Sequence, residues 1–159
     1  MIWRDLQVVA PEIAQLGKER LDQAGVALLG TLRKDGAPRI SPVEPYFTQG
    51  HLLFGAMSWS LKVRDLQRDP RCVLHSAVSH PDSGEGELKL YGNAEAAPDR
   101  FRDACLDAWW VGRASETASV FSLGIEEATF ISWELEAGEM LVRRWSPKFG
   151  FRQTKRSYP

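Results

Sequence analysis

Two serines and a lysine lie where an apolar segment ends and a helix is expected to begin. The stretch "GAMSWSLKVRDLQRDPRC" places Ser58 and Ser60 after an apolar run and Lys62 in the first turn of the helix that follows. Hydroxyl groups, free backbone N–H groups and the dipole of a helix N-terminus all favour an anion, and Lys62 adds a positive charge. This spacing predicts a phosphate-binding turn or, as the simpler alternative, a capped surface helix with a solvated lysine.

The preceding segment, "GAPRISPV", offers a second candidate surface for a ligand. Pro42 has no backbone N–H, so it disturbs the regular pairing of any strand that contains it. Backbone groups left unpaired beside Ser41 and Val43 could then meet the polar edge of a flat heterocycle. An ordinary edge strand explains the same residues, and both interpretations stay open at this point.

The C-terminal segment is locally basic, although the whole chain is nearly neutral. Residues 141–159 contain no acid, and their cations are Arg143, Arg144, Lys148, Arg152, Lys155 and Arg156. Such a patch could bind a polyanionic ligand, contact acidic segments of another subunit, or remain a solvated tail.

The sequence offers few side chains that could act as catalysts by themselves. His51, His75 and His80 are scattered, and the apolar surroundings of His75 favour a core role. No Ser-His-Asp arrangement, HExxH motif, P-loop or metal-spaced cysteine cluster is present in the sequence. We therefore assign no metal and no catalytic residue, and expect a bound cofactor to perform the chemistry. Trp59 or Trp145 could stack on a planar ring of that cofactor.

Composition restricts the class of protein. A chain of 159 residues, 43% of them hydrophobic, predicts one domain spanning residues 1–159. The net charge of −1 gives no reason to expect nucleic acid or an anionic membrane as a partner, and no apolar run approaches the roughly 20 residues that span a bilayer. Without a recognisable signal peptide, the expected location is the cytoplasm, with Cys72 and Cys105 reduced and buried.

The spacing of apolar residues predicts the elements that must position these groups. The expected helices are 10–24, 60–68, 98–110 and a short one within 111–125, and the expected strands are 26–32, 39–47, 51–57, 72–78, 87–97 and two late strands around Ala137-Gly138. Asp35-Gly36 is a hairpin signal, so the first three strands are expected to form a meander. Short turns favour an antiparallel sheet, and closure into a small barrel would remove its exposed edges. The expected fold class is α+β, mainly β.

The order of these motifs resembles that of a known family. "ALLGTLRKDGAPRISPV", then "HLLFGAMSWSLKVRDLQRDPRCVLH", then "LKLYGNAE" resemble the pyridoxamine 5′-phosphate oxidase-like flavoproteins over residues 10–97, with weaker agreement towards the C-terminus. The resemblance implies an antiparallel split β-barrel of the FMN-binding type. It also implies a homodimer that binds flavin mononucleotide (FMN), or the deazaflavin coenzyme F-420, at the dimer interface.

By position, the resemblance further implies which residues hold the cofactor. Lys62 and Ser60, with Ser58 in the same turn, would hold the ribityl phosphate. The other implied contacts lie along the isoalloxazine ring, in the strand before the turn, or in the late region that a partner chain covers. They are Arg39, Ile40, Ser41, Pro42, Val43, Gly55, Ala56 and Trp145.

Three features depart from the oxidase itself. Leu61 stands where the oxidase has an arginine before the phosphate lysine, and Tyr46 stands where it has a lysine for the substrate phosphate. Its C-terminal arginine and histidine motif is not evident in "RRWSPKFGFRQTKRSYP". A substrate other than pyridoxamine phosphate is therefore expected.

Three functions follow as expectations. The first is an FMN-dependent oxidoreductase that transfers a hydride between the flavin and a small organic substrate. The second keeps this chemistry but uses coenzyme F-420, whose anionic polyglutamate the basic C-terminal segment could attract. The third is a flavin- or haem-binding protein with no turnover of its own.

Overall fold

The structure is a computed structural model that describes residues 1–78, 84–108 and 118–158. Its helices are α1 (Trp3–Val9), α2 (Pro11–Ala24), α3 (Leu61–Arg68) and α4 (Asp99–Ala108). Its strands are β1 (Ala27–Leu32), β2 (Pro38–Val43), β3 (Pro45–Thr48), β4 (His51–Met57), β5 (Arg71–Ser76), β6 (Glu87–Ala96), β7 (Ala118–Glu134), β8 (Glu139–Ser146) and β9 (Gly150–Ser157). His80, the end of the helix expected over 98–110 and the first part of the expected short helix lie outside the described residues.

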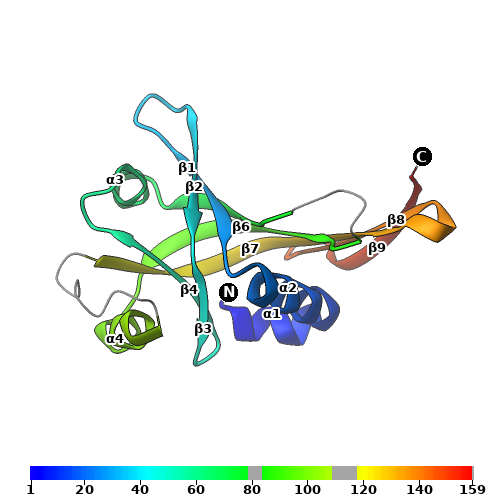
Figure 1. The fold of residues 1–159 in the computed structure, drawn as a ribbon, viewed down its shortest axis with the longest axis horizontal. Coiled ribbons are helices and arrows are strands. Elements are labelled where there is room, and N and C mark those ends of the chain that lie inside the picture. Colours follow the sequence, from blue (N-terminus) through cyan, green and yellow to red (C-terminus); the bar gives the residue numbers. More distant parts are fainter. Residues whose placement is uncertain (79–83, 109–117, 159) are drawn as a thin grey trace.

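One antiparallel sheet organises the described chain (Figure 1). Its strand order is β2-β1-β5-β6-β7-β4-β3, and β8 continues from β7 to β9. The long strand β7 pairs with β4, β6 and β8, so it joins the two halves of the sheet. A mainly antiparallel sheet with helices confirms the α+β prediction. Closure is not seen, because among the described residues no ladder joins β2 to β3.

The predicted three-stranded meander is correct in its two hairpins and wrong in its middle strand. The segment expected as one strand over 39–47 breaks at Glu44 into β2 and β3, which pair with different neighbours, β1 and β4. Pro42 and Pro45 flank the break, and neither can donate a backbone hydrogen bond to a ladder. The break lets β5, β6 and β7 lie between the two hairpins.

Three other elements differ from the sequence-based prediction. The first helix, α1, was not predicted, and it caps the sheet through the buried side chains of Trp3 and Leu6. The described residues 118–125, expected to belong to a short helix, are part of β7, because pairing with both β4 and β6 overrides an ambiguous local pattern. The basic tail contains a strand that was not predicted, β9, although all eight of its residues are exposed.

The core lies between the sheet and the first two helices. Ile13 and Leu21 of α2 are fully buried together with Leu88, Leu90 and Leu123 of β6 and β7. Each such side chain contributes about 1.5–3 kcal/mol to folding. A smaller cluster joins α4 to β4 and β7, and its members are Leu53, Phe101, Cys105 and Val120. None of the helices in the described ranges is long and apolar enough to cross a bilayer.

Both cysteines are buried and free, as predicted. Burial raises the pKa of Cys72 and of Cys105 to about 12, so almost no thiolate forms at neutral pH. We expect neither thiol to react with a disulfide reagent at pH 8 in the folded protein, and both to react at once in denaturant. Rapid release of the reagent's chromophore from native protein would contradict this expectation.

Candidate functional site

The turn between β4 and α3 presents uncapped polar groups. Ser60 is the N-cap of α3 in an extended conformation, and its backbone N–H donates to the carbonyl of Met57 at 2.8 Å. Its side chain makes no capping hydrogen bond, and its Oγ is buried with no hydrogen-bond partner among the described residues. A buried hydroxyl without a partner costs about 1–3 kcal/mol, so a polar ligand that reaches this atom would be stabilised by a hydrogen bond to it.

Lys62 turns back from the first turn of α3 towards β2. Its Nζ donates a hydrogen bond to the carbonyl oxygen of Pro42 at 2.7 Å. Desolvation of this half-buried amine lowers its pKa from the ordinary value of 10.5, and the nearby carboxylate of Glu44 opposes the change. Lys62 is therefore not simply solvated, and two of its three N–H donors remain available to an anion.

Ser58 is held by the neighbouring strand. Its Oγ lies 2.9 Å from the Oγ of Ser119, the second residue of β7. The pairing of Gly55 with Val120 and of Ala56 with Ser119 brings the two strands together there. Ser119 is a contact of the site that sequence reasoning missed, because the pairing of β4 with β7 was not predicted.

The predicted ring-binding segment is an edge strand. Among the described strands, β2 pairs with β1 alone, and Ser41 lies opposite Leu29. The side chain of Ile40 is 72% exposed and Val43 is buried, so the strand presents alternate faces to solvent and to the core. Through the contact of Lys62 with Pro42, this edge lies directly beside the first turn of α3.

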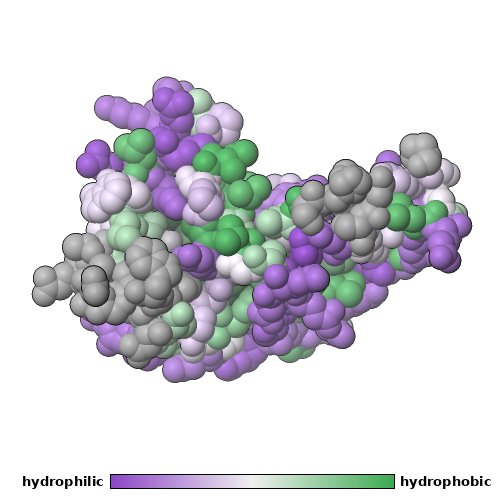
Figure 2. All heavy atoms as spheres, viewed as in Figure 1, coloured by the Kyte–Doolittle hydropathy of each residue, from purple (hydrophilic) through white to green (hydrophobic). Residues whose placement is uncertain are grey.

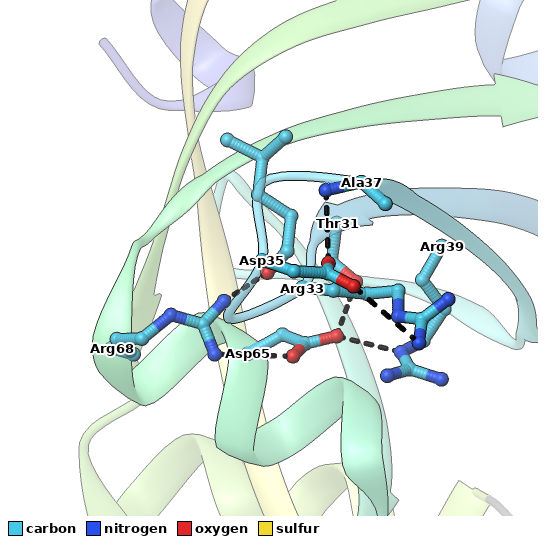
Figure 3. A network of polar contacts seen from close by, with 8 residues as sticks. Thr31, Arg33, Asp35, Ala37, Arg39, Asp65 and Arg68 are labelled. Carbon is cyan, nitrogen blue, oxygen red and sulfur yellow. Dashed lines mark hydrogen bonds and ion pairs between the residues drawn. The ribbon is translucent and has the colours of Figure 1, made fainter.

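A buried carboxylate anchors α3 to the β1–β2 hairpin (Figure 3). Asp65, whose side chain is 6% exposed, accepts a hydrogen bond from Arg39 Nε at 2.6 Å and from Thr31 Oγ1 at 3.2 Å. Arg68 pairs with the second carboxylate oxygen at 3.3 Å and also donates to the carbonyl of Leu32. Arg39, a predicted cofactor contact, is thus already engaged by Asp65. The sequence feature that could have identified Asp65 is that it is the single acidic residue among the basic residues of α3.

Burial and hydrogen bonding act in opposite directions on Asp65. Burial alone would raise the pKa of its carboxyl group. The hydrogen bonds from Arg39, Thr31 and Arg68 outweigh that effect and hold the pKa below its ordinary value of 3.8. The carboxylate is therefore charged at neutral pH, and it fixes the orientation of α3 relative to β2.

The structure does not bring every predicted residue to this place. Trp145 lies in β8, whose hairpin with β9 projects from the opposite end of the sheet from α3 (Figure 1). Its role at a cofactor stays a prediction that depends on a second copy of the chain. His51 contacts the hydroxyl of Ser122, and His75 lies between the carbonyl of Ser76 and the carboxylate of Glu87. The described residues contain no group of three side chains suited to a metal ion.

Several solved structures share this fold. PhzG from Burkholderia lata 383, in complex with tetrahydrophenazine-1-carboxylic acid, has a TM-score of 0.69 and 12% identity, covering 98% of this chain and 93% of its own. A haem-binding protein from Mycobacterium smegmatis has a TM-score of 0.61 and 17% identity, covering 94% of this chain and 90% of its own. HutZ, the haem storage protein of Vibrio cholerae, has a TM-score of 0.60 and 15% identity, covering 74% and 90%.

Comparison of sequences identifies the family. No curated protein matches the chain. The family described as pyridoxamine 5′-phosphate oxidase matches residues 14–132, which is well over half of the chain and includes β1 to β6, α3 and most of β7. The chain therefore belongs to the pyridoxamine 5′-phosphate oxidase family.

Proposed function

We propose that the first turn of α3 holds the phosphate of FMN and that the protein uses this flavin to transfer a hydride to or from a small organic substrate. The observation that carries the proposal is the buried Oγ of Ser60, which lacks a partner at an uncapped helix start. Lys62, half-buried beside it, supplies the positive charge that a phosphate requires. Membership of the family supports a flavin over other phosphate-bearing ligands.

The residues present fit an FMN molecule in two respects. Ser60, Lys62 and the free N–H groups at the start of α3 would bind the phosphate, and Ser58 is positioned to extend this set. The β2 segment from Arg39 to Val43, with Gly55 and Ala56, would lie along the ring. The flavin supplies the redox chemistry, whereas the chain positions the ring, excludes water from it and directs backbone donors at its polar edge.

Replacement of Ser60 by alanine separates the binding role from a structural one. The variant removes a buried hydroxyl that has no partner, so we expect the free energy of unfolding of the cofactor-free protein to stay unchanged or rise by about 1 kcal/mol. The affinity for FMN should fall by about 5- to 10-fold, since one hydrogen bond to the phosphate is lost. Chemical denaturation and FMN titration measure the two effects. A loss of stability with unchanged FMN affinity would show that Ser60 serves the fold alone.

A homodimer would complete the site. Leu28, Ile40 and Tyr91 are 40%, 72% and 43% exposed, and with Val73 they border an apolar hollow of about 330 Å³ on the strands next to β2. Figure 2 shows hydrophobic side chains, in green, exposed over β1 and β2. A second copy seated on this surface would cover the flavin ring and could bring its own Trp145 to it. Sedimentation velocity tests the dimer directly.

The flavin proposal is tested on protein purified from cells. We expect a flavin absorption spectrum, or saturable FMN binding by colourless protein, and oxidation or reduction of the bound flavin by NADPH or trial acceptors. No flavin spectrum together with no saturable FMN binding would contradict the proposal. Binding without any turnover would favour a carrier over an enzyme.

Two alternatives share this fold. Use of coenzyme F-420 predicts that the deazaflavin binds more tightly than FMN in paired titrations, whereas a clear preference for FMN would eliminate it. Haem binding is suggested by two of the similar structures. Among the described residues, however, both ring nitrogens of His75 face oxygen atoms, at 2.6 and 3.4 Å, and His51 contacts Ser122. These contacts favour the flavin.

A further inference from the structure

We propose that the β8–β9 hairpin carries a binding site for a small aromatic anion, a ring that bears a phosphate or carboxylate group. A pocket of about 390 Å³ lies on one face of this hairpin, and Arg144, Phe149, Arg152 and Arg156 line it. The hairpin lies at the opposite end of the sheet from α3 (Figure 1). Within one chain, the pocket is therefore separate from the turn proposed to hold the FMN phosphate.

The pairing of the two strands places three arginines on one face. Arg144 lies directly opposite Arg152, and Arg156 follows four residues after Arg152 on the same strand. Because side chains alternate between the faces of a strand, all three point to the same side of the hairpin. Thr154, between the last two, adds a hydroxyl to the pocket lining.

The basic residues of the opposite face have acidic partners, and these three arginines do not. Arg143 Nε donates to Glu12 Oε1 at 2.6 Å, and Lys155 Nζ donates to Glu139 Oε2 at 2.7 Å. No carboxylate in the described ranges forms an ion pair with Arg144, Arg152 or Arg156. The hairpin thus pairs the basic residues of one face with carboxylates and leaves three arginines without an ion pair on the other.

This arrangement costs stability in the absence of a ligand. Like charges directly opposite each other in an antiparallel pair repel, and β9 is exposed along its whole length. Glu127 is the carboxylate that lines the pocket, against the three arginines. A pair of like charges in directly opposite positions of a strand pair is unfavourable, and unfavourable local choices of this kind are characteristic of functional sites. A bound anion between Arg144 and Arg152 would remove the repulsion.

The pocket also provides an aromatic surface. The guanidinium of Arg152 lies 4.5 Å from the ring centroid of Phe149, which is itself 52% exposed. Guanidinium forks match phosphate and carboxylate oxygens in pairs, and exposed rings favour a planar ligand. The volume suits a small molecule. The chain's net charge of −1 argues against extended nucleic acid.

Calorimetric titration of the whole protein tests the proposal with phenyl phosphate and benzoate as probes. We expect saturable binding of at least one of them and no binding of neutral phenol, and the tighter probe identifies the phosphate or the carboxylate as the source. Inorganic phosphate should bind more weakly than phenyl phosphate because it lacks the ring. No saturable binding of either aromatic anion would overturn the proposal.

Variants locate the binding site. Arg152→Gln and Arg156→Gln should each weaken the tighter probe by about 10-fold, the scale of one charge-assisted hydrogen bond. The matched control is Lys155→Gln, which removes the same charge from the same strand but from the face paired with Glu139, and it should leave the affinity unchanged. An equal loss in Lys155→Gln, or unchanged affinity in both Arg152→Gln and Arg156→Gln, would overturn the proposal.

Discussion

Replacement of Lys62 by alanine is expected to weaken FMN binding by about 10- to 100-fold, the consequence of losing one charge-assisted hydrogen bond to the phosphate. The effect should be large for a single lysine because its ammonium group is partly removed from water, so its attraction to an anion is less screened. Quenching of flavin fluorescence during titration measures the affinity.

Arg64→Ala is the matched control for this prediction. Arg64 is a cation of the same helix two residues further on, and it is exposed at the edge of a different groove, near Arg33 and Arg68. Its removal lowers the charge of the protein by the same amount and should change FMN affinity less than twofold. Equal losses in the two variants would mean that long-range charge, not a contact at the first turn of α3, attracts the ligand.

Replacement of Asp65 by alanine is expected to lower the free energy of unfolding by about 2–4 kcal/mol, because two arginines and a buried threonine hydroxyl lose their shared acceptor. The contacts with Arg39 and Arg68 join α3 to the β1–β2 hairpin, so the variant should also loosen the turn that carries Ser60. Denaturant unfolding measures the loss. Asp22→Ala removes an exposed pair with Lys18 and should cost less than about 1 kcal/mol.

The same carboxylate predicts a pH dependence of stability. Its pKa in the folded protein lies below the ordinary value of 3.8, so the folded state holds the charged form more strongly than the unfolded state does. The contribution of Asp65 is therefore fully present above the pKa of the unfolded chain and is lost as pH falls through the lower folded pKa. The difference in stability between wild type and Asp65→Ala should shrink on acidification below about pH 4. A difference independent of pH would show that the charge is not the cause.

Local sequence patterns were enough to predict the elements whose signals are local. The helix α2 follows from apolar spacing and from Gly25, and β6 follows from the alternation of Leu88 and Leu90, both of which are buried as expected. Gly92 lies on the same face of β6, and the absence of a side chain there is explained by a close backbone contact that the alternation does not reveal. A Cβ added there would lie 1.9 Å from the carbonyl oxygen of Gly124, at a shift in the pairing of β6 with β7.

Strand partners could not be predicted in the same way. The break at Glu44 sends β2 and β3 to different neighbours, and this choice depends on long-range pairing with β1 and β4. The strand β9 was missed because all eight of its residues are exposed, so no apolar alternation marks it. Pairing with β8 alone makes it a strand.

In the candidate site, too, local features were predicted from the sequence and long-range contacts were not. The turn with Ser60 and Lys62 was predicted from residue types, since a strand that ends in small polar residues before a helix has a local signature. The contact of Lys62 with Pro42 joins two of the predicted segments and was not visible in the sequence. Asp65 and Ser119 were missed because their partners come from strands distant along the chain.

The central claim is that the first turn of α3 binds the phosphate of a flavin. Riboflavin has the same ring system as FMN but lacks the phosphate, so paired titrations of the two molecules measure the contribution of the phosphate to the binding affinity. We predict that wild-type protein binds FMN at least about 10-fold more tightly than riboflavin and that Lys62→Ala removes most of this difference. Equal affinities for both molecules, or a preference for FMN that Lys62→Ala leaves intact, would contradict the claim.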